Sequence, residues 1–201
     1  MALWMVRAGK KGEFEDLALE KGVAVIGWER LEDLSGIESR EALMAELEKA
    51  YPEASRQTLI NWATQIWSFV RDMQPGDLVA LPSKKRPVVH LGHLKGPYQY
   101  RPDLPPGALH TRPVEWEKEV PRSSIDQDLL YSLGASTTVC RITRNDAEKR
   151  IRALLEGKTN GPDGDGEPVD LEAVALDQIR RYIARRFKGH RLTDLVAAVL
   201  S

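Results

Sequence analysis

The chain has 201 residues, of which 42% are hydrophobic and 29% are charged, and its formal net charge is −1. This length and composition predict one sizeable domain with an ordinary core, and they exclude a collagen-like, disulfide-stapled or wholly disordered chain. No apolar run reaches the roughly 18 residues that a membrane-spanning helix needs, and the first residues lack a secretory signal. The single cysteine, Cys140, has no partner in the chain. We therefore expect a reducing, cytoplasmic setting and no membrane partner.

Hydrophobic periodicity predicts short strands alternating with helices in the first part of the chain. Apolar runs of strand length lie at residues 3–7 and 23–26, and helical spacing marks 13–21, 40–50 and 55–73. Ser39 and Ser55 are suitable N-caps for the second and third helices.

The second part of the chain is predicted to continue in the same mixed manner. Residues 77–81 and 88–94 read as a β-hairpin, 109–116 and 137–143 as further strands, and 125–133 and 147–155 as helices. From Gly157 to Pro168 the sequence holds four glycines and two prolines, which is linker composition. We expect a domain over 1–156, a linker over 157–169, and a helical segment over 170–201 that is too short for its own core.

Charge is distributed unevenly along the chain. Residues 13–53 carry 12 acidic and 4 basic side chains, whereas residues 84–152 carry 13 basic and 8 acidic ones. All six charges between Arg180 and Arg191 are positive. Such asymmetry favours a face that meets a polyanion, although solvated helix faces that balance each other in space explain it equally well.

Trp28 ends the second predicted strand, Pro75-Gly76-Asp77 leads into the third, and Gly92 and Gly96 mark the next. This order of elements resembles the EVE and YTH modules of the PUA superfamily. The resemblance covers residues 1–156. It implies an α+β fold in which a small β-barrel carries helices on its outside, and a pocket that accepts a nucleotide flipped out of its stack.

Three longer strings stand out in the sequence: Trp4–Gly9, Gly96–Pro106 and Asp177–His190. These strings are similar to the N-terminal half of Mrr-type restriction endonucleases. This resemblance implies that 192–200 begins a nuclease core whose catalytic part lies beyond the given sequence. We therefore expect no catalytic residue and no cofactor in this chain, and a divalent metal only in the missing nuclease domain.

The resemblance to EVE and YTH modules implies a set of pocket residues. Trp28 matches the aromatic position at the end of the second strand, and an aromatic face contributes about 1–3 kcal/mol per stacked base. For Trp62, which lies on the apolar stripe of its helix, packing in the core is the stronger reading. The expected base pocket comprises Trp28, Asn61, Trp62, Pro82, Ser83, Tyr98 and Tyr100.

A basic hairpin tip is the candidate for contacts to the phosphate backbone. Lys84, Lys85 and Arg86 lie between the two predicted hairpin strands, and Lys95, Arg101 and Arg112 are second choices. Such contacts position a protein on DNA without reading sequence. A solvated turn is an equally good explanation of the three adjacent charges.

Metal and catalytic constellations are not found in the sequence. His90 and His93 are three residues apart on a predicted strand, so they face opposite sides. No Cys-x-x-Cys, phosphate-binding loop or nucleophile elbow is present.

The leading hypothesis is a DNA-binding specificity module of a modification-dependent restriction enzyme, with double-stranded DNA carrying a modified base as its partner. One alternative is an RNA-binding PUA-like module. Another is a scaffold that forms a homodimer through the C-terminal helices, whose apolar stripe includes Leu171, Val174 and Ile179.

Overall fold

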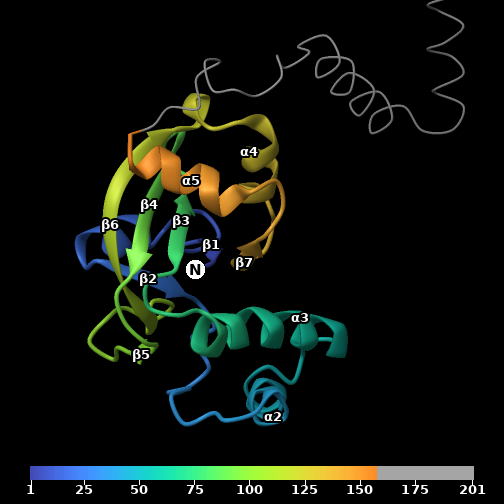
Figure 1. The fold of residues 1–201 in the computed structure, drawn as a ribbon. Coiled ribbons are helices and arrows are strands. Elements are labelled where there is room, and N and C mark those ends of the chain that lie inside the picture. Colours follow the sequence, from blue (N-terminus) through green and yellow to red (C-terminus); the bar gives the residue numbers. More distant parts are fainter. Residues whose placement is uncertain (158–201) are drawn as a thin grey trace, which may run out of the picture. The chain divides into compact units, whose positions relative to one another are not determined.

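The computed structural model describes residues 1–157, which form a mixed α+β fold (Figure 1). Within these residues seven strands make one curled, half-barrel sheet in the order β2-β6-β4-β3-β1-β7, with β5 paired to β6. The strands are β1 (Leu3–Val6), β2 (Val23–Ile26), β3 (Leu78–Pro82), β4 (Val88–Leu94), β5 (Gln99–Tyr100), β6 (His110–Pro121) and β7 (Val139–Ile142). The helices are α1 (Glu15–Glu20), α2 (Arg40–Ala50), α3 (Arg56–Trp67), α4 (Gln127–Leu133) and α5 (Ala147–Leu155), with a π-helical turn η1 (Ser68–Asp72) and a 3₁₀ turn η2 (Arg122–Ser124). The α+β class predicted from the sequence is confirmed at this level.

Most elements lie where the sequence predicts them. The N-caps of α2 and α3 are confirmed, because the Ser39 hydroxyl accepts from the Ala42 N–H at 3.1 Å and the Ser55 hydroxyl from the Thr58 N–H at 3.2 Å. The helix predicted over 55–73 ends as an α-helix at Trp67 and continues as the π-helical turn. The predicted linker and the helical segment over 170–201, with dimerisation through it, lie outside the described residues.

The long strand β6 gives the sheet its curl. Its first part, His110–Pro113, pairs with β2, and from Val114 onward it pairs with β4. The pairing with β4 is irregular between Leu91 and Gly92, where a Cβ on Gly92 would lie 2.2 Å from the Glu115 carbonyl oxygen. Only glycine allows this close approach of two backbones.

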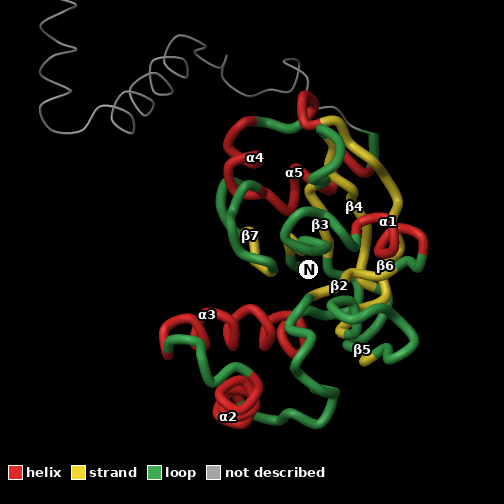
Figure 2. The backbone as a smooth tube through the Cα atoms, turned by 180° about the vertical axis from the view of Figure 1, so that it is seen from behind, coloured by secondary structure: helices red, strands yellow, loops and turns green. Residues whose placement is uncertain are grey.

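Helices cover both faces of the central strands, as Figures 1 and 2 show from opposite sides. In β1, Leu3 and Met5 pack with residues of α4 and α5, whereas Trp4 and Val6 pack with residues of α2 and α3. Successive side chains of a strand point to opposite faces. Because β1 is buried on both faces, successive residues are all apolar, which explains the unbroken apolar run in the sequence.

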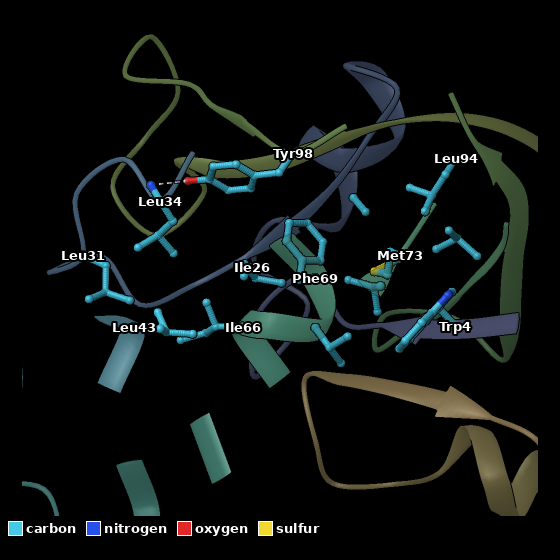
Figure 3. Close-up of a cluster of buried hydrophobic side chains, with 14 of the residues drawn as sticks. Trp4, Ile26, Leu31, Leu34, Leu43, Ile66, Phe69, Met73, Leu94 and Tyr98 are labelled. Atoms are coloured by element: carbon cyan, nitrogen blue, oxygen red, sulfur yellow. Dashed lines mark hydrogen bonds between the residues drawn. The ribbon is translucent and has the colours of Figure 1, made fainter. Parts of the chain in front are cut away.

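The cluster on the α2–α3 side is centred on the C-terminal part of α3 and on η1. Ile66, Phe69 and Met73 are fully buried there and meet Trp4 and Ile26 from the sheet (Figure 3). The π-helical turn, closed by a hydrogen bond from the Met73 N–H to the Ser68 carbonyl at 3.0 Å, places Met73 in this cluster.

Asp77, the last residue of the Pro-Gly-Asp motif, anchors β1 to the start of β3. Its buried carboxylate accepts hydrogen bonds from the Ala2 N–H at 2.8 Å, the Trp4 Nε1–H at 2.9 Å and the Gln74 N–H at 3.0 Å. Three donors compensate the cost of burying this carboxylate. The motif thus has a structural explanation within this chain.

The buried pair of Tyr98 and His110 leads to a prediction about acid stability. The Tyr98 hydroxyl lies 2.7 Å from His110 Nδ1, and burial lowers the pKa of His110, an effect that the backbones of Trp28 and Leu31 partly oppose. The folded state disfavours the charged imidazolium form of His110. Its contribution to the free energy of unfolding is therefore fully present above the pKa of a histidine in the unfolded chain, about 6.5. This contribution is lost as the pH falls toward the lower pKa of His110 in the folded state.

We therefore expect urea midpoints to decrease between pH 7 and pH 5, and His110→Gln to reduce this slope. An unchanged slope in His110→Gln would show that other groups cause the pH dependence.

Candidate functional site

One hollow of about 920 Å³ gathers segments that are far apart in the sequence. We call it the aromatic hollow. It is formed where β1 and β2 end, between α3, the β3–β4 hairpin and the loop that leads into β7. Its lining includes Arg7, Phe14, Trp28, Arg30, Tyr51, Trp62, Lys84, Gly107, Ser136 and Thr138.

Three aromatic rings form one wall of the aromatic hollow. The ring centroids of Trp28 and Trp62 are 6.3 Å apart at an interplanar angle of 69°, and those of Tyr51 and Trp62 are 5.2 Å apart at 72°. All three side chains are half-buried and pack against the core on one side. Their other sides offer flat apolar surface of the kind on which a planar ring stacks.

The backbone holds Trp28 in an uncommon conformation. Its φ is +62°, in the left-handed region that bulky residues rarely adopt. A hydrogen bond from the Leu31 N–H to the Trp28 carbonyl at 2.9 Å closes the turn that follows. Strain of this kind costs about 1–3 kcal/mol and concentrates at functional sites. The turn directs the indole of Trp28 to the hollow instead of continuing β2.

Cations outnumber acids around the aromatic hollow. Its basic residues are Arg7, Lys10, Arg30 and Lys84, and its acidic residues are Glu13 and Glu29. Within residues 1–157, the ammonium groups of Lys10 and Lys84 make no hydrogen bond or ion pair. These two side chains are therefore available to an anionic ligand.

Three of the four remaining charged residues of the hollow, Arg7, Arg30 and Glu13, have structural partners. The Arg30 guanidinium lies 2.6 Å from Glu53 and 5.1 Å from the centroid of the Tyr51 ring. Arg7 donates to the carbonyls of Leu133 and Ala135, and its pKa is lowered by burial and by Arg122. Backbone hydrogen bonds lower the pKa of the Glu13 carboxyl.

The structure brings together two of the seven expected pocket residues, Trp28 and Trp62, in the aromatic hollow. Asn61 lines a different hollow, on the other side of α3. Tyr100 is half-buried with its ring 5.5 Å from that of His110, and it does not line the aromatic hollow. Tyr98 lies in the core, where burial raises the pKa of its hydroxyl.

Pro82 and Ser83 are expected in the base pocket, but they are buried at the end of β3 and do not line the aromatic hollow. The Ser83 hydroxyl donates to Glu15 at 2.6 Å and accepts from the N–H groups of Lys85 and Arg86 at 3.1 and 2.9 Å. Ser83 therefore organises the hairpin turn that carries the basic residues. This role orients Lys84 toward the aromatic hollow.

The expected phosphate-binding cations separate into three groups. Lys84 alone lines the aromatic hollow. Four others are exposed or half-exposed in ion pairs: Lys85 with Asp16, Arg86 with Glu119, Lys95 with Glu115, and Arg101 with Asp103. Arg112 is only 2% exposed, and its guanidinium donates to the carbonyls of Phe69 and Gly96, so the structure places it in the interior and not on a DNA-facing surface.

Sequence reasoning missed Tyr51, Arg30 and the Ser136–Thr138 loop. Tyr51 follows α2 directly before Pro52 and resembles an ordinary helix end. It reaches Trp62 only because α2 and α3 pack against each other. No local pattern indicates this contact.

Within residues 1–157, no group of three or more His, Cys, Asp or Glu side chains is arranged to hold a metal ion. The described helices include none with the length and apolar character to cross a membrane.

Comparison with known proteins gives a family without an assigned function. Residues 4–142 match the family described as domain of unknown function DUF8426. No curated protein matches the chain. The NMR structure of Rpa0253 from Rhodopseudomonas palustris is 12% identical and covers 83% of this chain and 100% of its own, and its TM-score of 0.37 is too low to carry an argument. The match over most of the described residues shows that the chain belongs to the DUF8426 family.

Proposed function

We propose that residues 1–157 form a DNA-binding specificity module with a PUA/EVE-like barrel, the recognition part of a modification-dependent restriction enzyme. In this proposal a modified base leaves the duplex and enters the aromatic hollow. The observation that carries the proposal is the pair of half-buried indoles, Trp28 and Trp62, whose centroids lie 6.3 Å apart beside two unpaired lysines.

The energetics favour a bound base only if several contributions add up. Stacking on an aromatic face contributes about 1–3 kcal/mol, whereas flipping a base costs a few kcal/mol. A methyl group buried against the rings adds about 0.8 kcal/mol, and phosphate contacts from Lys10 and Lys84 supply further affinity. A base that bears an apolar modification is therefore the ligand that this hollow suits best.

Fluorescence anisotropy with matched duplexes tests the proposal. We expect tighter binding to a duplex that carries a methylated or hydroxymethylated base than to the unmodified duplex. Single-stranded RNA is included as a competitor, and stronger competition by RNA than by DNA would favour the RNA-binding alternative. Equal affinities for all modifications, or no oligonucleotide binding at low salt, would refute the proposal.

Lys84 offers a test of the phosphate contacts. Because each neutralised phosphate contributes about −0.9 to the slope of log K against log salt, we expect Lys84→Ala to make the slope less steep by about one. The loss should be similar for modified and unmodified duplexes, since a phosphate contact reads no base. Lys49→Ala is the matched control, because Lys49 is exposed on α2 and does not line the aromatic hollow. Equal salt slopes for wild type and Lys84→Ala would show that Lys84 does not contact a DNA phosphate.

A further inference from the structure

A second hollow, of about 750 Å³, lies between the α3–η1 helix and β7. We call it the polar hollow. Asn61, Thr64 and Gln65 of α3 line one side, and Thr137 and Arg141 line the other, with Trp4 at its base. Apart from the Trp4 ring, the polar hollow is lined mainly by amide, hydroxyl and guanidinium groups. It also contains one carboxylate, that of Asp72, which accepts a hydrogen bond from the Ser68 hydroxyl at 3.0 Å.

A single hydrogen-bonded ridge separates the two hollows. The Gln65 side-chain oxygen accepts from the Thr138 N–H at 2.7 Å and from the Val139 N–H at 3.3 Å, which joins α3 to the start of β7. Along α3, Trp62 lines the aromatic hollow and its neighbour Asn61 lines the polar hollow. Along the loop, Ser136 and Thr138 line the first and Thr137 lines the second. A nucleic-acid strand that is bound in one hollow therefore reaches the other hollow by crossing this one ridge.

Several polar groups of the polar hollow have no partner among the described residues. The Asn61 side chain is exposed and makes no hydrogen bond. The Thr137 hydroxyl is buried and also makes none. The Arg141 guanidinium forms no ion pair or hydrogen bond and lies 5.9 Å from the centroid of the Trp4 ring. An unpartnered buried hydroxyl is costly unless water or a ligand satisfies it.

These groups suit a nucleobase. Guanidinium planes are surfaces on which unstacked bases lie, and Asn side chains bond to base edges. The Trp4 indole that supports Arg141 is fixed from below by its hydrogen bond to Asp77. The hollow thus combines a flat cation with free hydrogen-bonding groups at its edge.

We infer that the polar hollow binds the nucleotide next to the flipped one on the same strand, so that two adjacent nucleotides leave the stack. This inference rests on the proposed function. It assigns recognition of the modification to the aromatic hollow and recognition of its neighbour to the polar hollow.

The test uses duplexes that carry one modified base and differ only at the neighbouring pair. A mismatch at that pair relieves part of the cost of unstacking, which is a few kcal/mol per base. We expect the mismatch to tighten binding by the wild-type protein about tenfold or more. With the neighbour varied over the four bases, we expect a preference of roughly 5- to 150-fold for one of them.

Two variants and two controls assign these effects to the polar hollow. We expect Asn61→Ala to bind duplexes with each of the four neighbouring bases with similar affinity. We expect Arg141→Ala to lose most of the increase in affinity that the mismatch causes in the wild-type protein. Gln57→Ala and Arg144→Ala are the controls, because both residues are exposed and line neither hollow. Urea unfolding checks that all four variants fold.

The outcomes separate this inference from the proposed function. Preference for the modified base with no effect of the neighbour, or with a neighbour effect that both variants retain, overturns the inference and leaves the proposed function intact. Failure of the wild-type protein to bind any of the duplexes overturns both.

Discussion

Replacing Trp28 with alanine is expected to weaken binding to a modified duplex by roughly 5- to 150-fold. The loss follows from the about 1–3 kcal/mol that an aromatic face contributes when it stacks on a base. Trp28 is half-buried, and its ring lies edge-on to that of Trp62, so the variant removes one of the three rings that form the aromatic wall of the hollow. Anisotropy titrations with modified and unmodified duplexes measure the change, and the ratio of the two affinities should approach one.

Two further variants distinguish stacking from a general loss of structure. Trp28→Phe keeps an aromatic face and should retain most of the affinity. Tyr131→Ala removes an aromatic ring that is 57% exposed and outside the hollow, so it should leave binding unchanged. If Trp28→Ala binds modified DNA as tightly as wild type, the indole of Trp28 does not contact the base and the proposed pocket is wrong.

The fold is predictable from the sequence to the extent that its signals are local. Ser39 and Ser55 precede helical periodicity and cap helices, because a hydroxyl beside free N–H groups stabilises a helix start wherever the helix packs. The apolar run of β1 is long enough only for a strand. The π-helical turn after Trp67 has no such signal, since it depends on which side chains the core accepts.

The candidate site is less predictable, because it is made by contacts between distant segments. Trp28 stands out in the sequence, since it ends an apolar run and begins a polar one. Tyr51 does not, because its position against Trp62 depends on the packing of α2 on α3. The resemblance to EVE and YTH modules implies that Ser83 lines the base pocket, yet its hydroxyl bonds to Glu15 and to the N–H groups of the hairpin turn. A charged or polar residue reveals its role only once its partners are known.

Arg112 is the clearest example of a charged residue whose role depends on its partners. Its substitution has the largest expected effect on the free energy of unfolding. Its guanidinium donates to the Phe69 carbonyl at 2.8 Å and to the Gly96 carbonyl at 3.1 Å, linking β6 to η1 and to the turn before β5. Burial lowers the pKa of Arg112 to about 10, against the opposing effect of Asp77. Removing the guanidinium leaves two buried carbonyls without donors, each at a cost of about 1–3 kcal/mol.

We therefore expect Arg112→Met to lower the free energy of unfolding by about 2–5 kcal/mol, measured by urea denaturation at pH 7. Arg112→Lys should recover part of this loss, because one ammonium serves as a donor but lacks the planar fork that reaches two carbonyls. Arg144→Ala, at an exposed arginine, should change stability by less than about 0.5 kcal/mol.

DNA binding by Arg112→Met provides a second test of where Arg112 lies. At temperatures where Arg112→Met is folded, its affinity for DNA and its salt slope should equal those of wild type, because a guanidinium buried among carbonyls neutralises no phosphate. A variant of wild-type stability with a less steep salt slope would instead place Arg112 at the DNA surface.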